Sequence, residues 1–278
     1  RIPPIRVPGD GDDPVSSGYH RTAMTDQLSL RLEPALPNPP ATLRPMLARS
    51  LPEPFDSPDH LFEPAWGGRR ALAFIGPAEA PGGGEVTFLG EDGKPLAMLP
   101  PELAGLGVRV AARSAVLDGE LVVVDANGRA DAAELERRLA GEAGRPVTFL
   151  AFDLLYLDGR SLLQVPLERR RDQLRRTLRP GDEVLTVPAI PGEGRALFDA
   201  VMAQGLAGVL ARQRFSPYLP GVRSRLWRFV PAGGESAGAS PAQAGEAVTE
   251  AGAGSAPVLA LIRRLPLGFD EPGGTDSD

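Results

Sequence analysis

The chain has 278 residues, of which 42% are hydrophobic, so it is long enough to bury a sizeable core. It contains no cysteine, which excludes disulfides, thiolate metal sites and a cysteine nucleophile. The formal net charge of −6 belongs to the two ends, since residues 41–232 sum to about zero. No apolar run can cross a bilayer and no signal-peptide layout begins the chain, which predicts a cytoplasmic protein without membrane contact.

Both ends have compositions that disfavour a packed core. Residues 1–40 are rich in proline, glycine and aspartate, and we expect a disordered or mispredicted N-terminal tail. Whether the protein starts at residue 1 or at Met24 stays open from the sequence. Residues 233–278 form an acidic, low-complexity stretch with one short apolar segment at 258–269, expected to form a strand or short helix that docks back. These compositions predict a single folded domain over residues 41–232.

The predicted domain mixes hairpins with helices. Residues 71–76 and 85–90 alternate like paired strands, and residues 114–130 predict a strand, an Asp-Gly step, a second strand and an Asn-Gly turn. The remaining elements follow in chain order: a helix over 132–141, a long buried strand over 146–159, a basic amphipathic helix over 166–178, and a helix ending near 205 that leads into a strand ending at 213. Hairpins without regular strand-helix alternation favour the α+β class.

Residues 211–229, "ARQRFSPYLPGVRSRLWRF", carry arginines without any acid, interleaved with Phe215, Tyr218 and Trp227. The arginines are Arg212, Arg214, Arg223, Arg225 and Arg228. Such a patch suits phosphate, and Tyr218 or Trp227 could stack on an exposed base. A solvated arginine face with no ligand has the same composition, and both interpretations stay open.

The order of motifs from about residue 45 to 230 resembles the adenylation (nucleotidyltransferase) domain of ATP-dependent DNA ligases, of the bacterial end-joining type. The segments that carry the resemblance are "PMLA" at 45–48, "AVLDGELVVVD" at 115–125, "FLAFDLLYLDG" at 149–159, "PLERRRDQL" at 166–174 and "SPYLPGVRSRLW" at 216–227. The resemblance implies an ATP-grasp-like fold of two packed, mainly antiparallel sheets with helices. Because only a short stretch follows residue 230, we expect no C-terminal OB barrel.

The resemblance also implies a chemistry in which a lysine attacks the ATP α-phosphate and carboxylates hold a divalent metal, so ATP and magnesium are the family's cofactors. In "FEPAWGGRRA" at 62–71, the position of the nucleophilic lysine is Ala65 and that of the following aspartate is Gly67. A second metal-side carboxylate is replaced by Ala207, and the closing lysines by Phe229 and Pro231. We therefore predict that no catalytic site is intact and that this chain need not use either cofactor.

A few positions of the family's site survive. Glu63, Arg70 and Phe152 are a predicted remnant of the nucleotide site, and in the family the aromatic residue at 152 stacks on adenine. Glu120 is the candidate metal ligand, although a carboxylate after an Asp-Gly step can equally be a turn-capping or solvated group. The chain has one lysine, Lys94, which lies at a predicted hairpin tip.

Two functions remain open from the residues. One is a catalytically inactive relative, linked to DNA repair and end joining, that acts by binding DNA or a DNA repair protein. The alternative is an active ATP-dependent ligase or nucleotidyltransferase with displaced catalytic residues, which requires Lys94 or a partner's lysine at the pocket. A decaying protein without a selected role is a third possibility.

Overall fold

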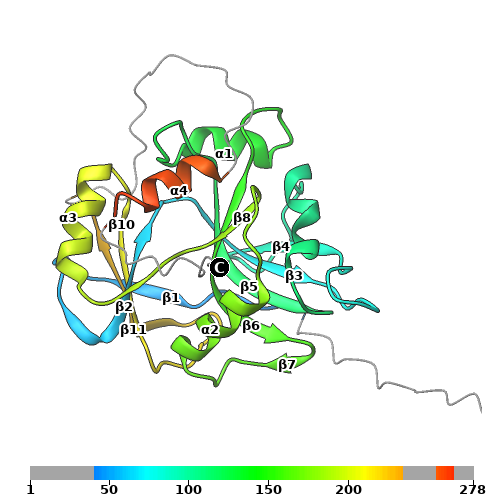
Figure 1. The fold of residues 1–278 in the computed structure, drawn as a ribbon, viewed down its shortest axis with the longest axis horizontal. Helices are drawn as coiled ribbons and strands as arrows, with labels where there is room; N and C mark the ends of the chain where they lie inside the picture. Colours follow the sequence, from blue (N-terminus) through cyan, green and yellow to red (C-terminus); the bar gives the residue numbers. More distant parts are fainter. Residues whose placement is uncertain (1–40, 234–254, 266–278) are drawn as a thin grey trace, which may run out of the picture. The chain divides into compact units, whose positions relative to one another are not determined.

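Two β-sheets packed against each other form the centre of the fold (Figure 1). The computed structural model describes residues 41–233 and 255–265. Side chains from both sheets share the buried clusters between them, as Ala211 does with Phe152 and Trp227 with Leu155. With helices on the outer faces, this is the α+β architecture of two mainly antiparallel sheets that the sequence predicts.

The first sheet has the strand order β1-β11-β10-β2-β9. Its strands are β1 (Leu47–Ser50), β2 (Ser57–Ala65), β9 (Ile190–Gly192), β10 (Gly208–Gln213) and β11 (Arg223–Pro231). All neighbours are antiparallel except β1 and β11, which run parallel. The pairing of β2 with β10 sets Ala65 opposite Gly208 and Glu63 opposite Leu210, so the predicted site positions of the two strands meet side by side.

The second sheet has the order β4-β3-β5-β6-β7, with β8 also paired to β6. Its strands are β3 (Arg69–Ile75), β4 (Val86–Gly90), β5 (Ala115–Val122), β6 (Thr148–Leu157), β7 (Arg160–Ser161) and β8 (Val184–Thr186). Only β6 and β8 are parallel. The predicted hairpin at 71–90 is confirmed as β3 and β4, and the long buried strand as β6.

The predicted step at Asp118-Gly119 does not divide two strands, because β5 runs through it with only a shift of register. The reason is local packing. A side chain at Gly119 would overlap the ring of Phe149, which packs edge-on against Phe88 at 5.1 Å between centroids. Glycine is needed here for space inside a strand, whereas Gly128, with φ of 84°, makes the predicted turn.

Helices cover the outer faces of both sheets. They are the 3-10 helix η1 (Pro101–Arg109), α1 (Ala132–Leu139), α2 (Leu167–Thr177) and α3 (Gly194–Gln204). α1 begins where the Asp131 carboxylate accepts the Glu134 N–H at 2.9 Å, and α3 ends at Gly205 with φ of 70°. α3 packs on β10 and β2, while η1, α1 and α2 pack on the second sheet.

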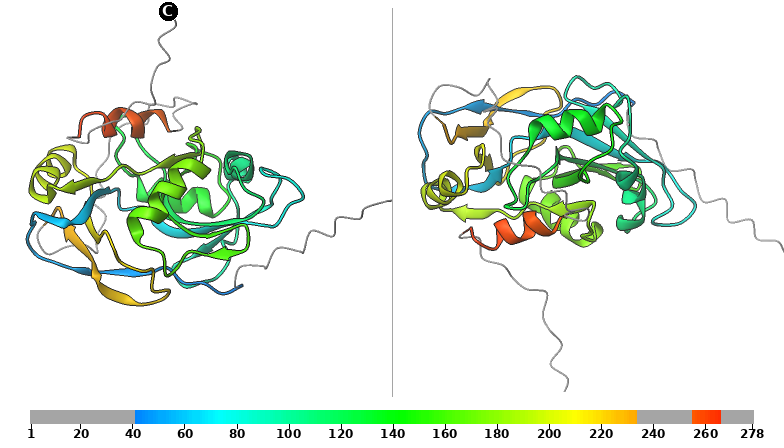
Figure 2. Two further views of the ribbon diagram at one scale, coloured as in Figure 1. Left: turned by 60° about the horizontal axis from the view of Figure 1, so that its bottom comes forward. Right: turned by 90° about the horizontal axis from the view of Figure 1, so that it is seen from above.

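Helix α4 (Ala256–Ile262) lies outside the two sheets (Figure 2) and falls in the apolar segment predicted at 258–269. Val258, Leu261 and Ile262 are buried in the cluster that holds Trp66 and Leu206. The stretch therefore docks as a helix, while residues 266–269 lie outside the described residues. The proposed domain boundaries at 41 and 232 remain a prediction.

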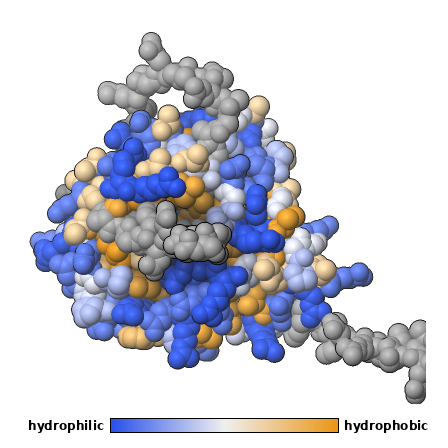
Figure 3. Space-filling model, viewed as in Figure 1, coloured by the Kyte–Doolittle hydropathy of each residue, from blue (hydrophilic) through white to orange (hydrophobic). Residues whose placement is uncertain are grey.

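On the face drawn in Figure 3, hydrophilic side chains cover most of the periphery and apolar ones gather nearer the middle. Residues 1–40, predicted as a tail, lie outside the described part of the chain. Within the described ranges, no helix combines the length and the apolar character that a membrane span requires.

Candidate functional site

A cavity of about 200 Å³ lies between the two sheets and gathers four of the positions where the sequence predicts lost catalytic groups. These positions are Ala65 at the end of β2, Gly67 in the next loop, Ala207 before β10 and Phe229 on β11. The first three lie in direct contact, and the Ala207 N–H donates to the Ala65 carbonyl at 3.0 Å. A Cβ placed on Gly67 would lie only 2.9 Å from that of Ala207.

Arg70, Glu120 and Phe152, three of the surviving positions, also line the cavity. Arg70 projects from β3 and donates two hydrogen bonds of 2.6 Å to the Asp118 carboxylate. The Tyr218 hydroxyl donates to the same carboxylate at 2.7 Å. Arg70 is thus held in one orientation by a buried acid, as expected of a charge that is kept in a protein interior.

The Glu120 carboxylate is engaged by the loop that carries the lost nucleophile position. It accepts the Gly68 N–H, and the N–H groups of Trp66 and Gly67 also favour its charged form. Burial nevertheless raises the pKa of Glu120 above its ordinary value. Through these contacts the Glu120 carboxylate anchors the loop. The described ranges contain no group of three or more His, Cys, Asp or Glu residues placed to hold a metal ion, and the metal-binding role of Glu120 stays a prediction.

Two predicted positions lie away from the cavity wall. Pro231 ends β11 opposite Gly208. Glu63 is 1% exposed and is engaged by two buried arginines, since Arg171 donates to it and Arg212 Nη1 lies 3.1 Å from its Oε2. Its carboxylate therefore balances the charge of two arginines inside the protein.

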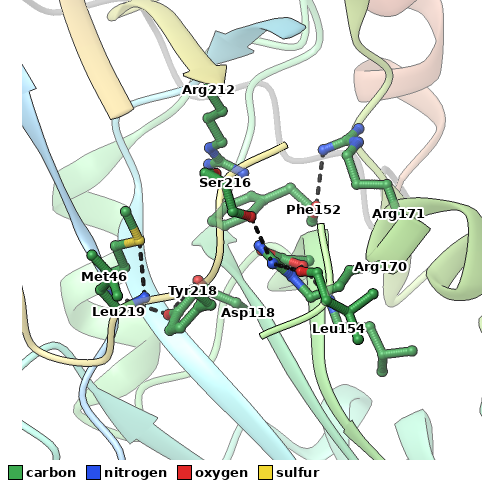
Figure 4. Close-up of polar contacts among 12 residues, drawn as sticks. Met46, Asp118, Phe152, Leu154, Arg170, Arg171, Arg212, Ser216, Tyr218 and Leu219 are labelled. Carbon is green, nitrogen blue, oxygen red and sulfur yellow. Dashed lines mark hydrogen bonds and ion pairs between the residues drawn. The ribbon is translucent and has the colours of Figure 1, made fainter. Parts of the chain in front are cut away.

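Arg212 does not belong to the predicted surface patch, because its side chain is completely buried. Its guanidinium carbon lies 3.8 Å from the Phe152 ring centroid and 4.5 Å from that of Trp227 (Figure 4 shows Arg212 beside Phe152). Tyr218 and Trp227 are themselves 0% exposed and pack edge-on at 5.5 Å, so neither can stack on an exposed base. The sequence interpretation was wrong for these three residues because β10 and β11 direct them toward the core.

The other predicted arginines have different surroundings. Arg214 pairs with Glu168 at 3.0 Å, and Arg228 is half-buried opposite Arg49 of β1. Arg223 and Arg225 are exposed at the start of β11, where Arg223 also donates to the Ala48 carbonyl at 2.7 Å. Only the last two are open to a ligand in solution.

The sequence reasoning missed two buried arginines on α2. Arg170 makes two hydrogen bonds of 2.8 Å to Asp153, and both side chains are 0% exposed. Arg171 donates to the Phe152 carbonyl at 2.9 Å (Figure 4). It also donates to Glu63. The sequence contained one signal for these buried arginines of α2. Asp153 is an acid in the middle of a predicted buried strand, and a buried charge requires a partner of opposite charge.

A larger hollow of about 380 Å³ lies beside Arg44, Asp92 and Gly221. It shares Glu91 with the first cavity, but it contains none of the positions that the motifs identify. The chain's lysine is near this region on the turn after β4, with its side chain 81% exposed and its Nζ 3.7 Å from Asp92. Lys94 is not part of the wall of either cavity.

The residues present do not fit ATP and magnesium. Sites for ligands of this size occupy about 300–1,000 Å³, more than the cavity offers. Phe152 already carries the Arg212 guanidinium, and Glu120 is tied to the loop. The cavity wall supplies no lysine to phosphates, and of its two carboxylates, Glu91 and Glu120, the second already accepts the Gly68 N–H.

Comparison with known proteins gives this cavity a context. A family model described as ATP dependent DNA ligase domain matches residues 45–228. The multifunctional non-homologous end joining protein LigD of Mycobacterium bovis is 37% identical over 166 residues, which are 60% of this chain and 21% of that protein. DNA ligase C1 of Mycolicibacterium smegmatis is 32% identical over 198 residues, covering 66% of this chain and 55% of that protein.

A solved structure of mycobacterial DNA ligase D complexed with ATP and MES is similar with a TM-score of 0.58 and 31% identity, over 68% of this chain and 60% of that one. The chain thus spans about a fifth of the length of the first relative and just over half of the second. The family match over residues 45–228 includes strands of both sheets, from β1 into β11.

Proposed function

Since the chain belongs to the ATP-dependent DNA ligase domain family, we propose that it keeps the fold of that family without its covalent chemistry and acts by binding DNA or a DNA repair protein. The observation that carries this proposal is the wall of the cavity. Its residue at the nucleophile position is Ala65, and the wall contains no lysine. A methyl group cannot attack a phosphate, and an arginine cannot replace the lysine because its guanidinium stays protonated.

The rival function is a working nucleotidyltransferase with displaced catalytic residues. It would need Lys94 as the nucleophile, but this side chain is 81% exposed on a turn and pairs with Asp92. The position of Lys94 outside the cavity wall supports the inactive interpretation. Without Lys94, an active nucleotidyltransferase would need a nucleophilic lysine that another protein supplies to the cavity.

A nick-sealing assay separates these functions. The full chain is incubated with a nicked duplex, ATP and either magnesium or manganese, beside the Lys94→Ala variant. We expect no sealing by either protein. Sealing by the wild type that is lost in Lys94→Ala would contradict the proposal and identify the displaced nucleophile.

The DNA-binding part of the proposal depends on Arg223 and Arg225, the exposed arginines of β11. Arg214, by contrast, is paired with Glu168. Since Arg223 and Arg225 are exposed, both can approach phosphates. Binding through such contacts is independent of sequence and weakens with salt by about 0.9 in the log-log slope for each phosphate neutralised.

The test is fluorescence anisotropy with a short labelled duplex over a series of salt concentrations. The variant Arg223→Ala/Arg225→Ala should bind more weakly, with a slope smaller by about 2. The matched control is Arg175→Ala/Arg176→Ala, which removes the same charge from the exposed side of α2 and should keep more of the affinity. Equal affinity of wild type and the β11 variant would make a protein partner the better candidate.

The acidic end of the chain should oppose DNA at low salt. Residues 266–278 contain Asp270, Glu271, Asp276 and Asp278 and no basic residue. Deleting all of 233–278 would also remove α4 and uncover the apolar residues beneath it. The deletion should therefore be confined to 266–278, and it should tighten binding at low salt and have little effect at high salt.

A further inference from the structure

Arg212 occupies an unusual position for an arginine next to a cavity. Its guanidinium carbon lies 3.8 Å from the centroid of Phe152 and 4.5 Å from that of Trp227, and the side chain is completely buried. Phe152 is an aromatic wall of the cavity and is 3% exposed. The cation therefore lies against the ring of a residue that lines the cavity, although Arg212 itself is not among the lining residues.

The distance of 3.8 Å is van der Waals contact, so no layer of atoms fits between the guanidinium and the ring. Arg70 adds a second guanidinium, 4.5 Å from the same centroid and held by Asp118. A planar base needs one open face of an aromatic ring in order to stack on it. Arg212 thus uses aromatic surface that a base would otherwise cover.

Few directional contacts hold Arg212 in this place. Its Nη1 forms an ion pair with Glu63 Oε2 at 3.1 Å, but Nε, Nη1 and Nη2 all lack a hydrogen bond. Burial lowers the pKa of Arg212 below its ordinary value. Its position is therefore fixed mainly by the two rings and by one shared carboxylate.

We propose that Arg212 determines the ligand specificity of the cavity, because its guanidinium occupies the place on Phe152 that a purine would need. The cavity then excludes adenosine and its phosphates, independently of whether a nucleophile is present. This inference goes beyond the lack of covalent chemistry, since it concerns reversible binding, and it does not depend on DNA binding by β11.

The test is reversible binding of adenosine to the full chain and to Arg212→Ala. Binding is followed by the fluorescence of the two tryptophans, Trp66 and Trp227, and by ligand-observed NMR, which detects weak complexes. The variant should bind adenosine at least about 10-fold more tightly than the wild type, since a desolvated cation–π contact is worth that much or more. The control Arg214→Ala removes a neighbouring arginine that pairs with Glu168 and lies over Phe215 instead of Phe152, and it should bind like the wild type.

A second pair of variants protects the test against loss of folding. Arg212→Ala leaves Glu63 with one partner, so the double variant Arg212→Ala/Glu63→Gln removes the excess buried charge as well. Adding Phe152→Leu to the Arg212→Ala variant should abolish the gained affinity. The proposal is overturned if folded Arg212→Ala or its Glu63→Gln derivative binds adenosine no better than the wild type, or if the gain survives Phe152→Leu.

Discussion

Restoring an aspartate at Gly67, the position that the ligase motif assigns to this residue, should destabilise the fold. Gly67 has φ of 83°, in the left-handed region, which costs a residue with a Cβ about 1–2 kcal/mol. The new Cβ would also lie 2.9 Å from that of Ala207, and overpacking of this kind costs about 1–3 kcal/mol. Gly67→Asp should therefore lose about 2–5 kcal/mol of unfolding free energy.

Two other glycines separate the parts of this cost. Gly192 has φ of 89°, and a Cβ added there would meet no atom within 4 Å, so Gly192→Asp should show the backbone part alone. Gly105 has neither strain nor close neighbours, so Gly105→Asp should differ from the wild type mainly by the ordinary cost of a helical aspartate. In thermal unfolding followed by circular dichroism, Gly105→Asp should have the highest melting temperature of the three variants, Gly192→Asp the next and Gly67→Asp the lowest. The melting temperature of Gly67→Asp should lie about 4–20 °C below that of the wild type. A melting temperature of Gly67→Asp equal to that of Gly192→Asp would refute the steric part of this reasoning.

Four further outcomes are expected. Ala65→Lys should not restore nick sealing, because the other lost positions still leave phosphates and metal unsupported; sealing by this variant in a gel assay would contradict us. Glu63→Ala should lose about 3–5 kcal/mol in urea unfolding, since it strands two buried arginines. Its control Glu168→Ala, which removes a surface pair, should lose less than about 1 kcal/mol in the same measurement. Burial raises the folded-state pKa of Glu120, so ionising this carboxyl costs stability as pH rises above the ordinary glutamate pKa of about 4.3. The unfolding free energy of Glu120→Gln should therefore increase relative to that of the wild type as pH rises from about 4, and a difference that is constant with pH would count against us. Leu261→Asp places a charge in the buried cluster and should detach α4 from the domain. Limited proteolysis should then cleave the variant near residue 255 faster than it cleaves the wild type.

The sequence predicted the elements whose signals are local. Alternating residues at 71–90 indicated the hairpin of β3 and β4. The Asn127-Gly128 pair indicated the turn that follows β5, and Gly205 indicated the end of α3. The step at Asp118 was misread because a glycine needed for turning and one needed for space look identical in a sequence. Only the ring of Phe149, brought in by the neighbouring strand, distinguishes them.

The candidate site was predictable in its positions but not in its charges. Motif order alone brought Ala65, Gly67, Ala207 and Phe229 together, and these residues do share one cavity. Nothing local separates Arg212 from the exposed Arg223, because burial is decided by partners far away in the chain, such as Glu63. Long-range pairing of this kind turned a predicted DNA-binding residue into part of the core.

The covalent step is the most direct test of the central claim that this ligase fold lacks ligase chemistry. The full chain is incubated with ATP labelled at the α-phosphate, with magnesium and separately with manganese, and is then separated by denaturing electrophoresis. With alanine at position 65 and the chain's lysine outside the cavity wall, we predict that no label remains on the protein. Label that stays on the denatured chain, and is lost in Lys94→Ala, would contradict the claim and establish a displaced nucleophile.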